Sequence, residues 1–161
     1  MDEGSVNVKG VEAWICIALE PRSGRLLALE LSWTRNSLVA YRFLRHLRDM
    51  YGVGVIVADG AQWYVWPCTE LGLRLHVQRG GFHSLMERLS KEVKRRLKDF
   101  DLYFPCRCRE PFKHVKEWLE AWGGYYNHVR HHMSLGKPPR GYGGLEPYSM
   151  LSIVEEVMRK A

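Results

Sequence analysis

The chain has 161 residues, 46% of them hydrophobic, and its 24 Lys and Arg outnumber 18 Asp and Glu to give a formal net charge of +6. This length predicts one domain with a buried core, and no apolar run approaches the roughly 18 residues that a membrane span needs. The first residues lack the pattern of a signal peptide, so we expect a cytoplasmic protein without membrane contact, whose basic charge favours acidic partners.

The first part of the chain predicts three strands in a meander. Ser5–Lys9 is a short strand, and Val11–Leu19 is apolar on both faces, as a central strand buried on both sides would be. Pro21–Gly24 has the composition of a turn, and Arg25–Ser32 follows it as the third strand.

Helices and short strands alternate along the rest of the chain. In order, we expect a basic amphipathic helix Asn36–Met50 capped by Asn36 or Ser37, a buried strand Val53–Ala58, a short helix through Trp63 towards Leu71, a strand Leu73–Val77, a helix Phe82–Lys98, a helix Pro111–Asn127 interrupted at Gly123-Gly124, a loop Gly136–Pro147 and a closing helix Tyr148–Lys160. This order predicts an α/β domain with a mixed five-stranded sheet flanked by helices. We expect residues 1–147 to form the domain and residues 148–161 to pack on it as a C-terminal helix.

The helix that begins at Phe82 carries one carboxylate at the head of a basic stripe. At about 100° per residue, its apolar residues share one face, and a second line along the helix holds His83, Glu87, Lys91, Lys94 and Lys98. A lone acid on such a stripe is compatible with a metal-binding carboxylate that acts on a polyanion. The alternative is a solvated helix in which Glu87 and Lys91 support each other at i, i+4 spacing.

Basic residues also gather in two places along the sequence. The first group is Arg88, Lys91, Lys94, Arg95, Arg96 and Lys98, and the second is Arg130, His131, His132, Lys137 and Arg140. Clustering of this kind favours a nucleic acid as the partner. The cysteines do not predict a zinc site, because Cys106-Arg-Cys108 is too tightly spaced and has no second pair. We expect free thiols, with Cys16 as a small core residue.

Three acidic residues are placed where they are able to converge. Asp59 follows a buried strand, at the edge where open α/β sheets bind ligands, and Asp2 opens the first strand. If these strands are neighbours, Glu87 is expected to reach the same place from its helix. Mg²⁺ is the hard cation that such carboxylates hold. Each acid also has an ordinary alternative, since Asp59-Gly60 is a common turn and a residue at a chain terminus is often disordered.

Five segments of the sequence, in order, form a larger pattern. They are Asp2-Glu3 before Val6-x-Val-Lys-Gly10; Arg35 with Tyr41-Arg-Phe-Leu44; Val57-Ala-Asp-Gly-Ala61; Met86-Glu-Arg88 with Lys94-Arg-Arg-Leu-Lys98, Phe100 and Phe104-Pro105; and Trp118 with Tyr126-Asn-His-Val-Arg-His-His132 and Ser134-Leu-Gly-Lys-Pro-Pro139. Together they resemble the catalytic domain of the DDE transposases of prokaryotic insertion sequences, in the retroviral integrase-like superfamily. The resemblance spans residues 2 to about 147.

The resemblance implies an RNase H-like fold with Asp2, Asp59 and Glu87 as a metal-binding triad. It implies cleavage of transposon ends and strand transfer with Mg²⁺, for which Mn²⁺ substitutes, by a homo-oligomer on DNA associated with the nucleoid. The expected DNA contacts are Lys91, Lys94, Arg95 and Lys98, with Arg35, Trp63, Arg130 and His132 as further candidates, of which Trp63 and His132 have core packing as the alternative.

The chain departs from that family at three points. It starts at the first aspartate without the usual N-terminal helix-turn-helix region, which predicts DNA binding mainly through charge, with strong salt dependence. Only 28 positions separate Asp59 from Glu87, fewer than is common in the family, and Ser84 stands where an Asn commonly precedes the Glu. Two alternatives therefore remain: a truncated, inactive DNA-binding remnant, or a nuclease of the same fold that cuts without transposon ends.

Overall fold

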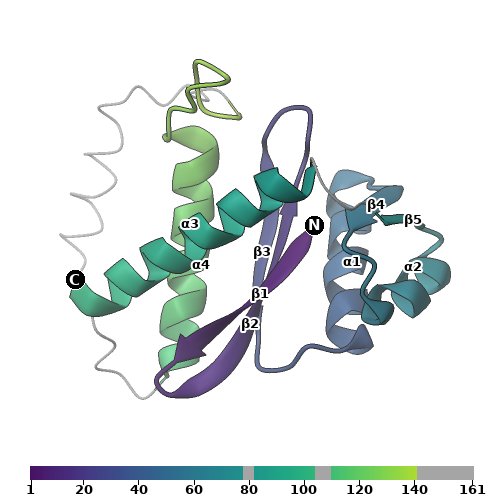
Figure 1. Ribbon diagram of the computed structural model, residues 1–161, viewed down its shortest axis with the longest axis horizontal. Helices are drawn as coiled ribbons and strands as arrows, with labels where there is room; N and C mark the ends of the chain where they lie inside the picture. The colour runs from purple at the N-terminus through teal and green to yellow at the C-terminus, as the bar shows by residue number, and fades with distance from the viewer. Residues whose placement is uncertain (78–81, 104–109, 141–161) are drawn as a thin grey trace.

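The computed structural model describes residues 1–77, 82–103 and 110–140. Its elements, in chain order, are β1 (Asp2–Val8), β2 (Val11–Leu19), β3 (Leu26–Ser32), α1 (Ser37–Tyr51), β4 (Val55–Ala58), the 3-10 turn η1 (Gln62–Tyr64), α2 (Val65–Leu71), β5 (Arg74–Val77), α3 (Phe82–Tyr103) and α4 (Pro111–His128) (Figure 1). The sequence predicted this order of strands and helices, so the α/β class is confirmed. No helix within the described ranges is both long enough and apolar enough to cross a membrane.

The first three strands form an antiparallel meander in the order β1-β2-β3. A two-residue turn joins β1 to β2, and its residues Lys9 and Gly10 both have positive φ, 52° and 87°, as a tight hairpin turn that matches the strand twist requires. The register places Asp2 opposite Ile17. The first strand is thus longer than the predicted Ser5–Lys9, because ladder pairing with the apolar β2 continues to the start of the chain.

The predicted single sheet of five strands is wrong. β4 and β5 form a separate two-stranded parallel sheet. The backbone nitrogen of Met1 donates to the carbonyl oxygen of Val57 over 2.7 Å and so links the two sheets. β4 ends at Ala58, close to where β1 begins. The two strands therefore run side by side only at this point and form no ladder of backbone hydrogen bonds.

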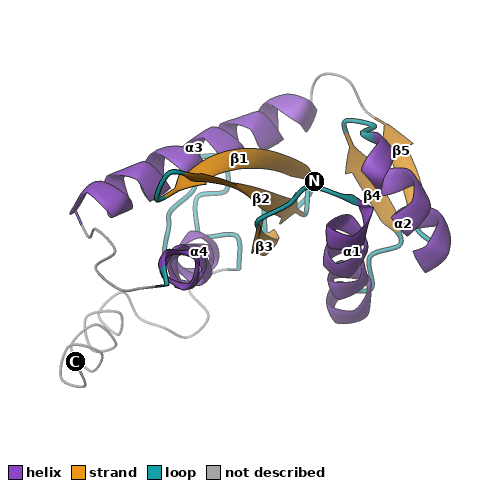
Figure 2. Ribbon diagram, turned by 90° about the horizontal axis from the view of Figure 1, so that it is seen from below, coloured by secondary structure: helices purple, strands orange, loops and turns teal. Residues whose placement is uncertain are grey.

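Two hydrophobic cores lie on opposite faces of the meander (Figure 2). On one face, the buried sides of α3 and α4 pack on Ile15 and Ile17 of β2, with Val93 and Leu119 among the most buried residues. On the other face, α1 packs on the meander and also on β4 and α2, with Phe43 fully buried between them. The second core therefore carries the small sheet and fixes β4 near β1.

Two asparagine side chains satisfy backbone groups at the ends of elements, one at the start of α1 and one at the start of β3. The side chain of Asn36 accepts hydrogen bonds from the backbone nitrogens of Leu38 and Val39, so the predicted cap of α1 is confirmed. The amide of Asn127 accepts from the nitrogen of Leu26 at 2.9 Å and donates to its oxygen at 2.7 Å. Asn127 in this way satisfies the first residue of the edge strand β3.

Two helices differ from their predictions. α4 runs unbroken through Gly123-Gly124 to His128, because its buried face, including Trp122 and Tyr126, packs on the sheet on both sides of the glycines. Tertiary packing outweighs the low helix propensity of glycine here. α3 extends beyond Lys98 to Tyr103. The predicted helix Tyr148–Lys160, most of the loop before it and Cys106 and Cys108 lie outside the described residues.

Gly60 joins β4 to the segment that follows it, and its replacement should be costly. Its φ is +85°, and a Cβ there would lie 2.7 Å from Cγ1 of Val77 in β5. We predict that Gly60→Ala lowers the free energy of unfolding by about 1–3 kcal/mol through backbone strain and overpacking. Urea unfolding measures this change, with Gly54→Ala as the matched control, because a Cβ at Gly54 meets nothing within 4 Å. Equal midpoints for the two variants would contradict the prediction.

Candidate active site at the junction of the two sheets

Asp2 lies where β1 meets the small sheet and faces α3. Its Oδ2 accepts a hydrogen bond from Oγ of Ser90 at 2.7 Å. Ser90 is buried on α3, one helical turn beyond Glu87. The first predicted acid therefore has a side-chain hydrogen bond to α3.

Asp59 is the first residue after β4 and turns the chain out of the strand. Its Oδ1 accepts from the backbone nitrogen of Ala61 at 3.0 Å, the pattern of an Asx turn. Gly60 provides the positive φ inside this turn. Asp59-Gly60 is therefore a turn, as one alternative predicted. This turn uses only Oδ1 of Asp59 and is compatible with a site that uses Oδ2.

A third carboxylate at this junction is Glu3, which the sequence analysis did not assign. Successive residues of a strand point to opposite faces, so Glu3 points away from α3. Its side chain is 5% exposed and lies 3.9 Å from Nη1 of Arg35. Burial, followed by the charges of Asp59 and Asp2, raises the pKa of Glu3 to about 7. These three acids are therefore close enough to interact through their charges.

Arg35 covers this acid from the loop before α1. Its guanidinium carbon lies 4.1 Å from the centre of the Trp14 ring and 4.2 Å from the centre of the Trp63 ring. The charge of Arg35 lowers the pKa of Glu3, as does the buried indole N–H of Trp63, which lies outside full hydrogen-bond geometry. Arg35 thus contacts two aromatic rings and a carboxylate at once.

Glu87 stands apart from the junction. Its side chain on α3 is 51% exposed and its Oε2 lies 3.7 Å from Nζ of Lys91. Both ribbon views place the start of α3 near the start of β1 (Figures 1 and 2). In the part of the chain that the structure describes, no three Asp, Glu, His or Cys residues form a group that is able to hold a metal ion. The structure brings Asp2 and Asp59 to one junction and leaves Glu87 beside it.

The junction has the chemistry of a site for a hard cation. Asp2 and Asp59 offer carboxylate oxygens, the ligands that Mg²⁺ prefers. Glu3 faces the other side of β1, where burial, followed by the charges of Asp59 and Asp2, raises its pKa. Asp2 and Asp59 therefore fit a divalent cation as ligands, whereas Glu87 fits only after its side chain leaves Lys91.

The basic residues of α3 form two kinds of contact. Lys91 is 80% exposed, Lys98 is exposed, and Arg95 is exposed with an ion pair to Asp99 at 3.5 Å. Lys94 instead bends back towards β1, where its ammonium fills the space that a side chain at Gly4 would need. An exposed basic surface of Lys91, Arg95 and Lys98 is therefore present on α3, and Lys94 borders the sheet.

The two late candidates for DNA contact lie in a packed cluster. Nη1 of Arg130 lies 2.5 Å from Oε1 of Glu92, an ion pair without hydrogen-bond alignment. The ring of His132 contacts the edge of Tyr126 with centroids 4.5 Å apart, and burial lowers the pKa of His132. Arg130 thus connects the end of α4 to α3, whereas His132 packs on α4 itself, and a neutral, partly buried His132 is poorly suited to bind phosphate.

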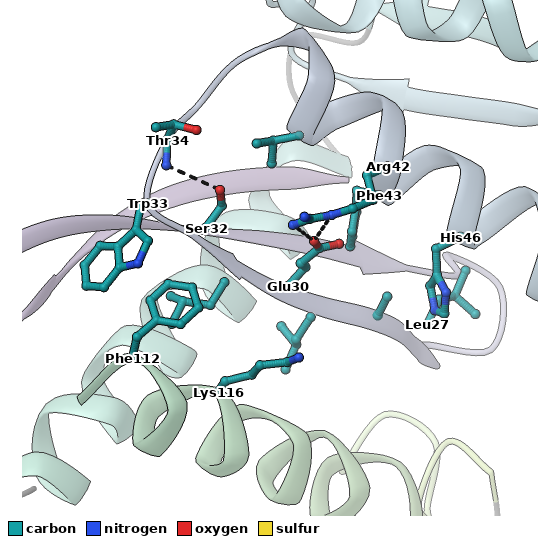
Figure 3. A pocket seen from close by; sticks show the side chains of 14 residues that line it. Leu27, Glu30, Ser32, Trp33, Thr34, Arg42, Phe43, His46, Phe112 and Lys116 are labelled. Atoms are coloured by element: carbon teal, nitrogen blue, oxygen red, sulfur yellow. Dashed lines mark hydrogen bonds and ion pairs between the residues drawn. The ribbon is translucent and has the colours of Figure 1, made fainter. Parts of the chain in front are cut away.

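A groove of about 790 Å³ lies away from the acids, on the outer edge of β3 between α1 and α4 (Figure 3). Glu30 and Arg42 are paired in it, with Nε of Arg42 2.7 Å from Oε1 of Glu30. Trp33 contacts Phe112 at its end in a tilted arrangement, with ring centroids 4.6 Å apart. None of the predicted site residues lines this groove.

Comparison of the structure with solved structures shows its fold. The catalytic core domain of HTLV-2 integrase in complex with magnesium, in its trimeric form, has a TM-score of 0.67 at 14% identity, covering 86% of this chain and 89% of that one. The core domain of BIV integrase has a TM-score of 0.59 at 17% identity, covering 98% and 96%. A chain of the simian T-cell lymphotropic virus intasome, solved in complex with PP2A regulatory subunit B56 gamma, has a TM-score of 0.68 at 18% identity, covering 86% of this chain and 50% of that one. The chain therefore has the fold of a retroviral integrase catalytic core.

Sequence comparison adds one relative of unknown role. No family model matches the chain. An uncharacterised protein of Methanocaldococcus jannaschii is 30% identical over 126 residues, which is 78% of this chain. The match covers 57% of that protein, so the chain spans a little over half the length of its relative.

The raised pKa of Glu3 predicts a pH-dependent stability. Glu3 holds its proton more tightly in the folded chain, about 7 against 4.5, so the stability that this group contributes is complete below about pH 4.5 and is lost as the pH rises through 7. We expect Glu3→Gln to abolish a loss on the order of 2 kcal/mol between pH 5 and pH 8. Urea unfolding at both pH values measures it, with the exposed Glu12→Gln as control. Parallel pH profiles for wild type and Glu3→Gln would contradict the pKa.

Proposed function

We propose that this chain is the catalytic domain of an insertion-sequence transposase, a polynucleotidyl transferase that cuts and joins DNA strands with a divalent cation. The observation that carries the proposal is the placement of Asp2 and Asp59 at one junction, where β1 meets the end of β4, within an integrase-core fold. The sequence resemblance chose the same two acids independently of their position in space. Glu87 is the third proposed ligand.

Each side chain has a defined part in this proposal. Asp2 and Asp59 would hold the cation from the sheet, and Glu87 would join them from α3. A bound Mg²⁺ would activate the attacking oxygen and stabilise the leaving oxygen of a phosphodiester. Ser90 orients Asp2 through its hydrogen bond, and the Ala61 N–H orients Asp59. In the structure Oε2 of Glu87 lies 3.7 Å from Nζ of Lys91, so its side chain would have to turn to reach the junction.

The exposed basic surface of α3 is the proposed track for the DNA backbone. Lys91, Arg95 and Lys98 are exposed on the helix that starts beside the junction. Contacts of this kind fix a duplex in register but do not read its sequence. The proposed partners are therefore the transposon ends and the target DNA, bound by a homo-oligomer of this chain.

A second function follows from the position of Glu87. Because this acid is paired with Lys91 and no three-residue metal group is formed among the described residues, the chain also fits a DNA-binding remnant without catalysis. A remnant would bind DNA with the same salt dependence and leave it uncut in Mg²⁺ and Mn²⁺.

Nicking of a supercoiled plasmid in Mg²⁺ and in Mn²⁺ tests the proposed activity. We expect Asp59→Asn and Glu87→Gln each to lower the nicking rate at least about a hundredfold, because a metal site supplies several kcal/mol to the transition state. Glu117→Gln, an exposed acid on α4 paired with Lys113, is the matched control and should keep the wild-type rate. If the folded wild-type protein binds DNA but nicks it with neither metal, the chain is a DNA-binding remnant.

A supplementary substrate separates a transposase from a general nuclease. Joining of a labelled 3′-hydroxyl end to plasmid is expected of a transposase, and nicking without joining is expected of a nuclease. Both reactions would use the same acids, so Glu87→Gln should lower the rate of either one. The two functions differ only in the DNA product.

The basic surface of α3 gives a separate prediction for DNA affinity. Removing two phosphate contacts with Lys91→Ala and Lys98→Ala together should weaken DNA binding and lower the slope of log K against log salt by about 2. Fluorescence anisotropy of a labelled duplex at several salt concentrations measures the slope. Lys113→Ala with Lys116→Ala, two exposed lysines of α4, is the control pair. A slope that only the control pair lowers would place the DNA on α4.

A further inference from the structure

We propose that Arg35 is a positioning residue that holds Glu3 and the η1 turn together, and so sets the place of Asp59 beside β1. The consequence for catalysis rests on the proposed function, whereas the positioning itself rests on contacts within the chain. Arg35 was a predicted DNA contact, and the structure gives it a different set of partners.

Three contacts converge on one guanidinium. Its carbon lies 4.1 Å from the centre of the Trp14 ring and 4.2 Å from the centre of the Trp63 ring. Its Nη1 lies 3.9 Å from Oε1 of the buried Glu3. These partners come from β2, from η1 and from β1 respectively, so Arg35 joins three elements from the loop before α1.

The position of this contact matters because it spans the joint between the two sheets. Trp14 and Glu3 belong to the meander, and Trp63 belongs to the turn that follows Asp59. At the backbone level, the described residues connect the sheets through the hydrogen bond from Met1 to Val57. The stack of Trp14, Arg35 and Trp63 therefore adds a side-chain connection directly beside the acids, at a place where ladder hydrogen bonds are missing.

Only arginine has the geometry that these contacts need. A guanidinium is planar, stacks on aromatic faces and still presents N–H groups at its edge, whereas a lysine ammonium is a compact charge without a plane. A lysine at position 35 would keep the charge near Glu3 and lose contact with at least one ring. Arg35→Lys therefore separates the positioning role from the charge.

The charge of Arg35 also acts on Glu3. Its Nη1 lies 3.9 Å from Oε1 of Glu3, whose side chain is 5% exposed. A buried carboxylate needs a partner of opposite charge close to it. Arg35 thus holds Glu3 at the junction by its charge as well as by its contacts with the two rings.

Hydrogen exchange of the η1 turn tests the positioning directly. The N–H groups of Ala61, bonded to Asp59, and Tyr64, bonded to the Ala61 carbonyl oxygen at 3.1 Å, report whether the turn is closed. We expect Arg35→Lys to speed their exchange about tenfold, because stacking on two rings is lost, and to leave the amides of α4 unchanged. Arg45→Gln, an exposed arginine of α1 over the single ring of Tyr41, is the control. Unchanged exchange at Ala61 and Tyr64, or equal acceleration throughout the chain, would overturn the proposal.

DNA affinity and its salt dependence, measured for Arg35→Lys and for a second variant, Arg35→Gln, distinguish positioning from DNA contact. Without metal, Arg35→Lys and Arg35→Gln should bind a labelled duplex as wild type does, within about twofold and with an unchanged salt slope. If Arg35→Gln lowers the slope by about 1 while exchange stays unchanged, Arg35 is a DNA contact and the proposal fails.

The catalytic consequence is measured last and is separable from the rest. If wild type nicks DNA, Arg35→Lys should raise the Mn²⁺ concentration needed for half-maximal nicking and leave DNA affinity unchanged, because the carboxylates are misplaced. If wild type does not nick DNA at all, the proposed function fails, and the exchange of Ala61 and Tyr64 still decides the role of Arg35.

Discussion

Burial of a carboxylate at a weakly joined edge is the main physical constraint on this site. Asp2, Glu3 and Asp59 meet where the meander touches the small sheet, and a hydrogen bond from the N-terminal nitrogen of Met1 to the carbonyl oxygen of Val57 crosses that edge. Polar groups at such a joint need partners for their oxygens. The surrounding contacts are arranged accordingly, with a hydroxyl and an amide N–H on the two aspartates and a stacked guanidinium on the glutamate.

Because Asp2 and Glu3 point to opposite faces of β1, the two neighbouring acids have different surroundings. Asp2 faces α3, which carries Ser90, Glu87 and the exposed basic surface. Glu3 faces the aromatic pair and Arg35, where burial raises its pKa. The strand therefore places one acid on the α3 side and its neighbour against Arg35. The integrase-core fold provides this division by placing α3 and η1 on either side of β1.

Periodicity and turn chemistry predicted most of the fold. The apolar β2, the Asn36 cap and the apolar stripe of α3 are local signals, and each was found where the sequence indicated. Local signals did not reveal that β4 ends level with the start of β1, so five predicted strands became two sheets. Glu3 was overlooked because it lies next to a stronger candidate, although strand alternation alone separates it from Asp2. Arg35 was predicted as a DNA contact, and its two aromatic partners were not foreseen because they are distant in sequence.

Asp2 and Asp59 are proposed to form a cation site that Glu87 completes. Anomalous diffraction from crystals soaked in Mn²⁺ is the decisive measurement, because it locates the ion without depending on activity. We expect manganese density between the carboxylates of Asp2 and Asp59, with the side chain of Glu87 turned away from Lys91 towards the ion. Ordered Asp2 and Asp59 without manganese between them at saturating Mn²⁺, or with manganese bound at other residues instead, would contradict it.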